Sequence, residues 1–160
     1  MKKNQKGFSL IELLIVVVII GIIAAIAIPN LLSARRAANE GSAVSTVRTL
    51  HSAQVAYSVT GTRQYGTLAD LRTIGSIDEV LATGTKSGYV FNVEIGTDAT
   101  SKTFALGASP TNASGFTATG TRNFCVAVEG VVYAYTAVST TPKTVPGSIA
   151  TCAAGGIGVQ

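Results

Sequence analysis

Histidine and cysteine are scarce in this chain of 160 residues, which contains one histidine, His51, and two cysteines, Cys125 and Cys152. The cysteines lack the close spacing and the accompanying histidines of a zinc site, so we expect no metal centre and no cofactor. The sequence also lacks a Gly-x-Ser-x-Gly nucleophile motif and a Gly-x-x-x-x-Gly-Lys phosphate loop. We therefore expect a protein that is not an enzyme.

Charged residues are also few, at 12% of the chain. The formal net charge is +4, but three of the twelve basic residues (Lys2, Lys3 and Lys6) lie close to the amino terminus. The remaining nine basic residues oppose eight acidic ones and form no basic stripe interleaved with aromatic residues. We therefore expect no nucleic-acid-binding surface.

The chain has instead a long apolar run near its amino terminus. From Leu13 to Leu32 the one strongly polar side chain is that of Asn30. A helix of about twenty residues covers the ~30 Å hydrocarbon core of a bilayer, whereas a secretory signal has a shorter apolar core. The run is therefore predicted to enter a membrane. The preceding lysines predict a cytoplasmic amino terminus and an exported chain after Arg35 and Arg36.

The carboxylate of Glu12 lies within this apolar segment. An unpaired charge at membrane depth costs on the order of 3 kcal/mol or more, which makes such a residue a functional candidate. No basic side chain lies within helical reach on its carboxyl side. Its partner must therefore come from another chain or from an amine created by proteolysis. The alternative is a neutral glutamic acid on a lone anchor helix.

The segment Lys6-Gly7-Phe8-Ser9-Leu10-Ile11-Glu12-Leu13-Leu14 resembles the type IV prepilin signature. The resemblance extends over residues 1–28, and Pro29 lies at the helix proline of that family. It implies that a prepilin peptidase removes residues 1–7 as a leader, cutting after Gly7, and methylates the new terminal Phe8. It also implies that Glu12, the fifth residue of the mature chain, pairs with the amino group of a neighbouring subunit.

The apolar helix is predicted to continue as an amphipathic helix to about residue 60. Polar residues lie elsewhere on the helical wheel, among them Arg36, Asn39 and Glu40. Gly21 lowers local helix propensity and Pro29 removes one hydrogen bond. The resemblance implies that these two positions give the helix flexibility during assembly. The apolar positions follow spacings of mostly three and four: Leu31, Leu32, Ala34, Ala37, Ala38, Val44, Val47, Leu50, Ala53 and Tyr57.

Residues 33–160 are predicted to form one globular head that includes the amphipathic half of the helix. An antiparallel sheet of about four strands should pack against this half, which gives an α+β pilin fold. Glu129 and Gly130 are expected to form a hairpin turn, and residues 136–160 have a loop composition. The expected elements are helical turns at 68–71 and 78–82 and strands at 89–95, 103–106, 124–128 and 131–135.

The head resembles the pilin family more loosely, through segments 119–125 and 129–133 and through the two cysteines. Cysteines of an exported domain most often pair, and Cys125 with Cys152 would close a loop of roughly 28 residues, worth about 3 to 4 kcal/mol. Glu94 and Asp98 could in principle contribute to a calcium site. We instead interpret them as a solvated strand end.

We therefore interpret the chain as a structural subunit of a type IV pilus. The resemblance implies a helical homo-polymer whose subunits lie in the bacterial inner membrane before assembly and in a surface filament afterwards. It also implies a prepilin peptidase and a pilus assembly machinery, with adhesion, twitching motility or DNA uptake as the output. Two alternatives remain, a type II secretion pseudopilin and an uncleaved membrane anchor that presents a binding domain. The cysteine pair favours the pilus over the pseudopilin.

Overall fold

The computed structural model describes residues 7–60, 64–96, 103–135, 152 and 157–159. The chain divides into two compact units, Met1–Ala34 and Arg35–Gln160. Helix α1 (Leu10–Val59) contributes residues to both, and it confirms the prediction of one long helix that ends near residue 60. The expected leader lies outside the described residues except for Gly7.

The first unit contributes an apolar helix without a core of its own among its described residues. Its large apolar side chains from Phe8 to Leu31 are 48–82% exposed. An 18-residue window of this helix has a mean hydropathy of 3.2, which together with its length suffices to cross a membrane. A surface this apolar and this continuous indicates contact with lipid or with other protein chains.

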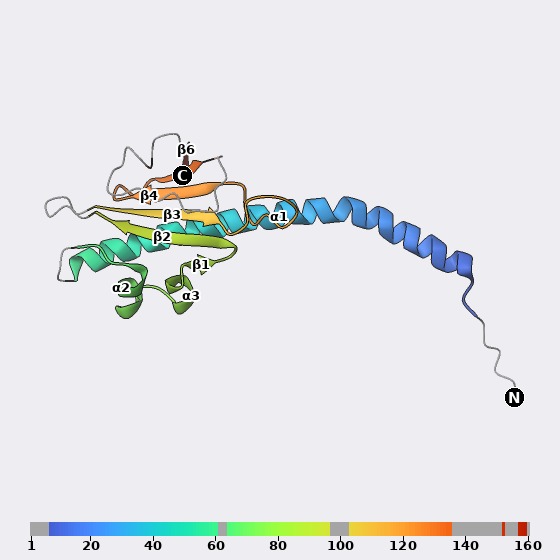
Figure 1. The fold of residues 1–160 in the computed structure, drawn as a ribbon, viewed down its shortest axis with the longest axis horizontal. Coiled ribbons are helices and arrows are strands. Elements are labelled where there is room, and N and C mark those ends of the chain that lie inside the picture. Colours follow the sequence, from blue (N-terminus) through green and yellow to red (C-terminus); the bar gives the residue numbers. More distant parts are fainter. Residues whose placement is uncertain (1–6, 61–63, 97–102, 136–151, 153–156, 160) are drawn as a thin grey trace, which may run out of the picture. The chain divides into compact units, whose positions relative to one another are not determined.

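The second unit contains an antiparallel sheet in which the strands follow each other in sequence order (Figure 1). The fold class is confirmed, and the described part of the sheet has six strands, two more than expected. The additional strands β1 and β6 have two and three residues, too few for an alternating pattern to show in the sequence. The strands are β1 (Thr85–Lys86), β2 (Tyr89–Ile95), β3 (Phe104–Pro110), β4 (Asn123–Ala127), β5 (Val132–Tyr135) and β6 (Ile157–Val159).

The pairing of the strands fixes which residues face the helix. Strands β2 and β3 pair antiparallel, from Tyr89 opposite Pro110 to Ile95 opposite Phe104. The turn between β4 and β5 is the one expected, and its Gly130 has a φ of 79°, which glycine adopts without strain.

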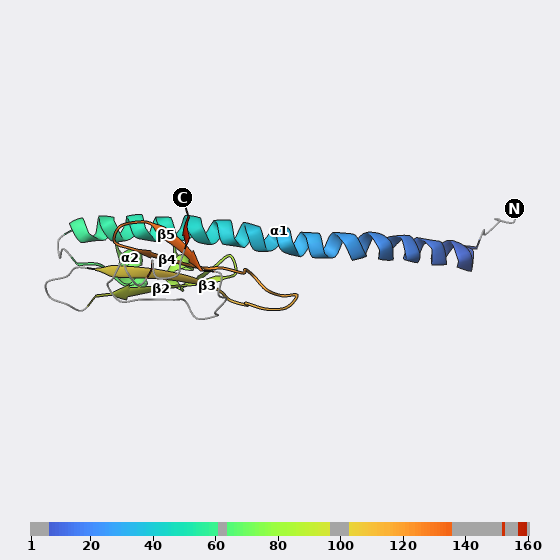
Figure 2. The same ribbon diagram turned by 90° about the horizontal axis from the view of Figure 1, so that it is seen from above.

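Both faces of the central strands β3 and β4 are buried. Figure 2 shows the carboxyl-terminal half of α1 running along one face of the sheet. Alternate residues of β3 and β4, such as Leu106 and Val126, pack with the α1 residues Val47 and Leu50 in the main core. The residues between them belong to a second cluster on the opposite face, made of Ala105, Cys125, Ala127, Tyr135 and Cys152. The carboxyl-terminal half of α1 therefore covers one face of the sheet, as the sequence predicts.

Two short helices lie between α1 and the sheet in sequence, where the sequence predicts helical turns. Helix α2 (Leu68–Thr73) begins with a capping box, in which Thr67 and Asp70 exchange hydrogen bonds. Helix α3 (Glu79–Ala82) is capped by the Asp78 side chain, which accepts a hydrogen bond from the Leu81 N–H. Each helix buries one leucine in the core.

Candidate functional site

Gly7 and Phe8 precede α1, and both are exposed. A side chain built on Gly7 would meet no atom within 4 Å, and Phe8 is 79% exposed. The helix begins just after them, where the Ser9 carbonyl accepts hydrogen bonds from the N–H groups of Glu12 and Leu13. The peptide bond between Gly7 and Phe8 therefore lies outside regular structure in a form that another protein can reach.

Glu12 lies in the first turn of α1 with its side chain turned back toward the helix start. Its Oε2 accepts a long hydrogen bond of 3.4 Å from the Ser9 N–H. A carboxylate at this end of a helix interacts favourably with the helix dipole. Within the described part of the chain, Glu12 forms no ion pair.

Gly21 and Pro29 both lie inside α1. A Cβ on Gly21 would meet nothing within 4 Å, so no contact within this chain requires glycine there. Pro29 lacks the N–H that would continue the helical hydrogen-bond ladder. Two residues that weaken a helix therefore lie in the exposed apolar half, where packing within the chain does not explain them.

Cys125 and Cys152 are joined by a disulfide, with 5.7 Å between their Cα atoms. Both cysteines are fully buried in the second cluster of the sheet. The bond ties Cys152, from the segment that the sequence marks as a loop, to the centre of β4. The neighbouring residues 136–151 and 153–156 lie outside the described residues.

A second carboxylate of α1, that of Glu40, forms a buried polar site that the sequence pattern does not reveal. The residue is 6% exposed, although the helical wheel places it among polar positions. Its Oε1 accepts hydrogen bonds from the N–H and the hydroxyl of Thr121, both at 2.8 Å. Its Oε2 accepts a hydrogen bond from Arg122 Nε at 2.8 Å and forms an ion pair with Arg122 Nη2 at 2.7 Å. The polar side of α1 is here covered by a segment about 80 residues away in sequence.

These contacts set the protonation state of Glu40. Burial raises the pKa of its carboxyl, but the hydrogen bonds from Thr121 and the charge and hydrogen bond of Arg122 outweigh burial, so the pKa lies below its ordinary value. Glu40 is therefore ionised at neutral pH. It joins α1 to the start of β4 by a charge-assisted bond.

The loop between β3 and β4, residues 111–122, is fastened to α1 by two further residues. Arg36 donates hydrogen bonds to the carbonyls of Gly115 and Ala118, at 2.9 and 3.3 Å. Asn39 donates to the Thr119 carbonyl at 2.9 Å. Arg36, Asn39 and Glu40 thus hold one loop within little more than one helical turn.

Tyr89 of β2 also contacts this loop. Its ring is fully buried, and its hydroxyl donates a hydrogen bond to the Arg122 carbonyl at 2.9 Å. Burial raises the pKa of this hydroxyl, so it stays protonated as a donor. A Cβ at Gly120 would overlap the Tyr89 hydroxyl, so the close approach of the loop requires glycine there.

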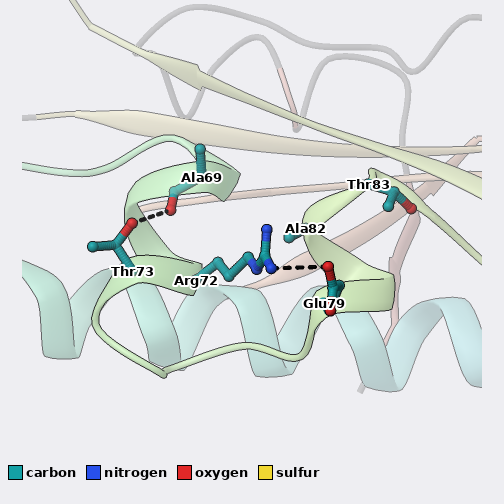
Figure 3. Close-up of a pocket in the computed structure, with 6 residues that line it drawn as sticks. All are labelled: Ala69, Arg72, Thr73, Glu79, Ala82 and Thr83. Atoms are coloured by element: carbon teal, nitrogen blue, oxygen red, sulfur yellow. Dashed lines mark hydrogen bonds and ion pairs between the residues drawn. The ribbon is translucent and has the colours of Figure 1, made fainter.

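A hollow of about 430 Å³ lies between α2 and α3, and Figure 3 shows its lining. Arg72 and Glu79 form an exposed ion pair of 2.8 Å across it. The other lining residues are Ala69, Thr73, Ala82 and Thr83, so the hollow contains no nucleophile with an adjacent base. It is a shallow surface feature between two short helices.

The described residues contain no group of three or more side chains that could hold a metal ion. Of the calcium ligands considered from the sequence, Glu94 lies on β2 and Asp98 lies outside the described residues. His51 contacts the Val128 carbonyl at 3.1 Å and packs against the ring of Phe104.

Comparison with known proteins relates the chain to pilins and to secretion proteins. Residues 2–28 match the family described as the prokaryotic N-terminal methylation motif. The type IV wide pilus major component of Thermus thermophilus is 66% identical over 38 residues, 24% of this chain and 29% of that protein. The type IV major pilin protein of Myxococcus xanthus is 46% identical over 54 residues, 34% of this chain and 24% of that protein.

The type II secretion system core protein G of Aeromonas hydrophila is 37% identical over 62 residues, 39% of this chain and 43% of that protein. The matched stretches thus span less than half of each of these relatives. No solved structure matches the chain significantly. The resemblance to prepilins that the first 28 residues carry is confirmed, and the chain is similar to type IV pilins and to type II secretion core proteins.

Proposed function

We propose that the chain is a non-enzymatic subunit of a helical filament of the type IV pilus kind. Residues 1–7 are a leader that a prepilin peptidase removes, which leaves Phe8 as a methylated amino terminus. Residues 8–32 anchor the subunit in the inner membrane and later form the filament core. Residues 33–160 form the head that the filament displays at the cell surface.

The position of Glu12 carries this proposal. Glu12 follows Phe8 by four residues in an exposed apolar segment, and among the described residues its carboxylate accepts one long hydrogen bond, from the Ser9 N–H. Opposite charges attract much more strongly in a medium of low dielectric than in water, and a charge without a partner there costs several kcal/mol. The amine created at Phe8 of a neighbouring subunit supplies the missing positive charge. The pair then fixes the axial offset at which each subunit joins.

The exposed apolar surface of this segment supports the same function. Lipid covers it before assembly, and copies of the same segment cover it in the filament. When two different surfaces of identical subunits are in contact, each subunit is related to the next by the same operation. If that operation combines a rotation with a translation, the assembly does not close into a ring and forms a helical filament. Gly21 and Pro29 let the helix bend or extend as subunits pack.

A type II secretion pseudopilin is the second candidate, because proteins of both kinds match the chain. The disulfide between Cys125 and Cys152 favours the pilus. Adhesion, twitching motility and DNA uptake are the outputs that a pilus of this kind serves.

Surface filaments sheared from cells and measured by intact-protein mass spectrometry test the proposal. We expect a chain that begins at a methylated Phe8. A full-length chain would contradict the processing, and absence of the protein from filaments would favour the pseudopilin or the uncleaved anchor.

A Glu12→Gln variant tests the ion pair, and Glu129→Gln is a matched control because Glu129 lies exposed in the turn between β4 and β5. We expect Glu12→Gln to be processed normally but to give few filaments, and the control to assemble as the wild type. Wild-type filament yield and symmetry for Glu12→Gln would refute the proposed pairing.

A further inference from the structure

One aromatic ring of the head is exposed although its backbone is held firmly. Phe116, in the loop between β3 and β4, is 76% exposed. The other large hydrophobic side chains exposed in the described part of Arg35–Gln160 are aliphatic: Val55, Val59, Ile74, Val80 and Val131. A single exposed apolar side chain is no evidence of a partner by itself, so the surroundings of Phe116 decide whether it has one.

Hydrogen bonds inside the loop define its shape. Asn112 Nδ2 donates to the Thr117 hydroxyl at 2.6 Å, and the Thr119 N–H donates to the Asn112 carbonyl at 2.8 Å. The Ala118 N–H donates to the Gly115 carbonyl at 3.3 Å, which closes a turn around Phe116. Figure 2 shows this loop extending beyond the end of the sheet. The Phe116 side chain is thus exposed on a loop whose backbone is held by hydrogen bonds.

The loop is bound to α1 immediately after the proposed membrane segment. Arg36 Nη2 donates to the carbonyl of Gly115, the residue before Phe116, at 2.9 Å. Arg36 follows Leu32, the last residue of that segment, by four residues, which is a rise of about 6 Å in a helix. The headgroup layer on each side of a bilayer is about 5 to 8 Å thick. Arg36 therefore follows the proposed membrane segment by about one turn of α1, a separation along the chain comparable to the thickness of the headgroup layer.

The charge around this position suits an anionic lipid surface. Arg35 is exposed and Arg36 adds a second guanidinium group, whereas the charge of Arg122 is balanced by Glu40. Residues 111–122 contain no acidic residue, and the nearby carboxylate of Glu40 is already bound to Arg122. Segments that bind a membrane surface typically combine Lys or Arg with Trp, Phe or Leu, so that the apolar side chain is buried while the charge reaches the headgroups.

We propose that Phe116 and the neighbouring arginines form a contact with the surface of an anionic bilayer, made while the subunit is anchored and before it is assembled. The contact holds the head against the membrane. This proposal rests on the proposed membrane anchoring of residues 8–32. The alternative is that Phe116 contacts a second copy of the chain, and the experiment below distinguishes this contact from a contact with lipid.

The absence of tryptophan from the chain allows a direct test. In the full-length protein, Phe116→Trp introduces one fluorophore at an exposed site where the larger ring meets no packing constraint. The protein is reconstituted in vesicles of phosphatidylethanolamine and phosphatidylglycerol, with and without lipids brominated at the upper part of the acyl chains. We expect blue-shifted emission that the brominated lipids quench.

Two matched variants complete the experiment. Val59→Trp, at the far end of α1 and 80% exposed, is expected to emit as in water without quenching. Ile20→Trp, inside the apolar segment, is expected to be quenched and reports the anchoring itself. If Ile20→Trp is quenched and Phe116→Trp is not, the interface contact is wrong while the anchoring stands.

If neither Ile20→Trp nor Phe116→Trp is quenched, the anchoring and this proposal are both overturned. Emission of Phe116→Trp that shifts with protein density but is insensitive to bromine would assign the surface to a second copy and overturn the lipid contact. Exchange of phosphatidylglycerol for zwitterionic phosphatidylcholine is expected to reduce the quenching. Equal quenching in both vesicles would overturn the role of the arginines.

Discussion

Replacement of Glu40 by alanine tests whether the loop between β3 and β4 stabilises the head. The change removes a carboxylate that accepts two hydrogen bonds from Thr121 and one from Arg122 Nε, each at 2.8 Å, and that forms an ion pair with Arg122 Nη2 at 2.7 Å. Hydrogen bonds to a charged group contribute about 1.5 to 3 kcal/mol each in buried settings, and breaking a buried ion pair costs about 3 to 5 kcal/mol.

The exposure of the partners reduces this cost. The Arg122 side chain is 46% exposed, and water can hydrate both it and Thr121 once the carboxylate is gone. Alanine also has the higher helix propensity, by a few tenths of a kcal/mol. We therefore expect Glu40→Ala to lower the free energy of unfolding of the head by about 2 to 3 kcal/mol, which corresponds to a Tm lower by roughly 10 °C.

Urea unfolding of the full-length chain in detergent, followed by the near-ultraviolet circular dichroism of the tyrosines, measures this difference. Ser45→Ala is the control, because Ser45 is exposed on the same helix. We expect the control to unfold within about 0.5 kcal/mol of the wild type, as exposed substitutions usually do. A Glu40→Ala protein as stable as the control would show that the buried ion pair does not stabilise the head.

Three further predictions concern the same head. The pKa of Glu40 in the folded state is below its ordinary value of 4.5, so the contribution of its ionised form to the free energy of unfolding is complete above pH 4.5 and is lost as the pH falls through the folded-state pKa. In urea titrations at a series of pH values, the free energy of unfolding of Glu40→Gln should therefore fall less on acidification than that of the wild type. Replacing Cys125 and Cys152 together by serine should lower the free energy of unfolding by about 3 kcal/mol, and unchanged stability would contradict the cross-link. Gly120→Ala should cost about 1 to 3 kcal/mol through its overlap with the Tyr89 hydroxyl, and less in a Tyr89→Phe background, as a double-mutant cycle by thermal unfolding would show.

The sequence predicts the parts of the fold that depend on local patterns. The apolar run and the spacing from Val44 to Tyr57 predict α1, and alternation from Tyr89 to Ile95 predicts β2. The turn at Glu129 and Gly130 joins two strands of which each is long enough to show an apolar pattern. These signals come from consecutive residues, so a single sequence contains them.

The remaining features depend on residues far apart in the chain. Glu40 and Arg122 are 82 positions apart, and the helical wheel alone assigns Glu40 to the solvent. The Tyr89 hydroxyl occupies the space that a side chain at Gly120 would need, but this relation is visible only when the packing of the loop against β2 is known. Pairing of this kind follows from tertiary packing, which periodicity does not contain.

Glu12 and Glu40 show what the two halves of α1 have in common and where they differ. Both are carboxylates of one helix in surroundings that disfavour an isolated charge. Glu40 receives three hydrogen bonds from its own chain and forms an ion pair with Arg122, so its buried charge has partners within the head. Glu12 receives one at 3.4 Å, within a surface of exposed apolar side chains. Among the described residues, the buried charge of the head therefore has its partners within the chain, whereas Glu12 has no ion-pair partner and its segment has no cover. A partner and a cover supplied by neighbouring subunits are what the proposed filament would provide.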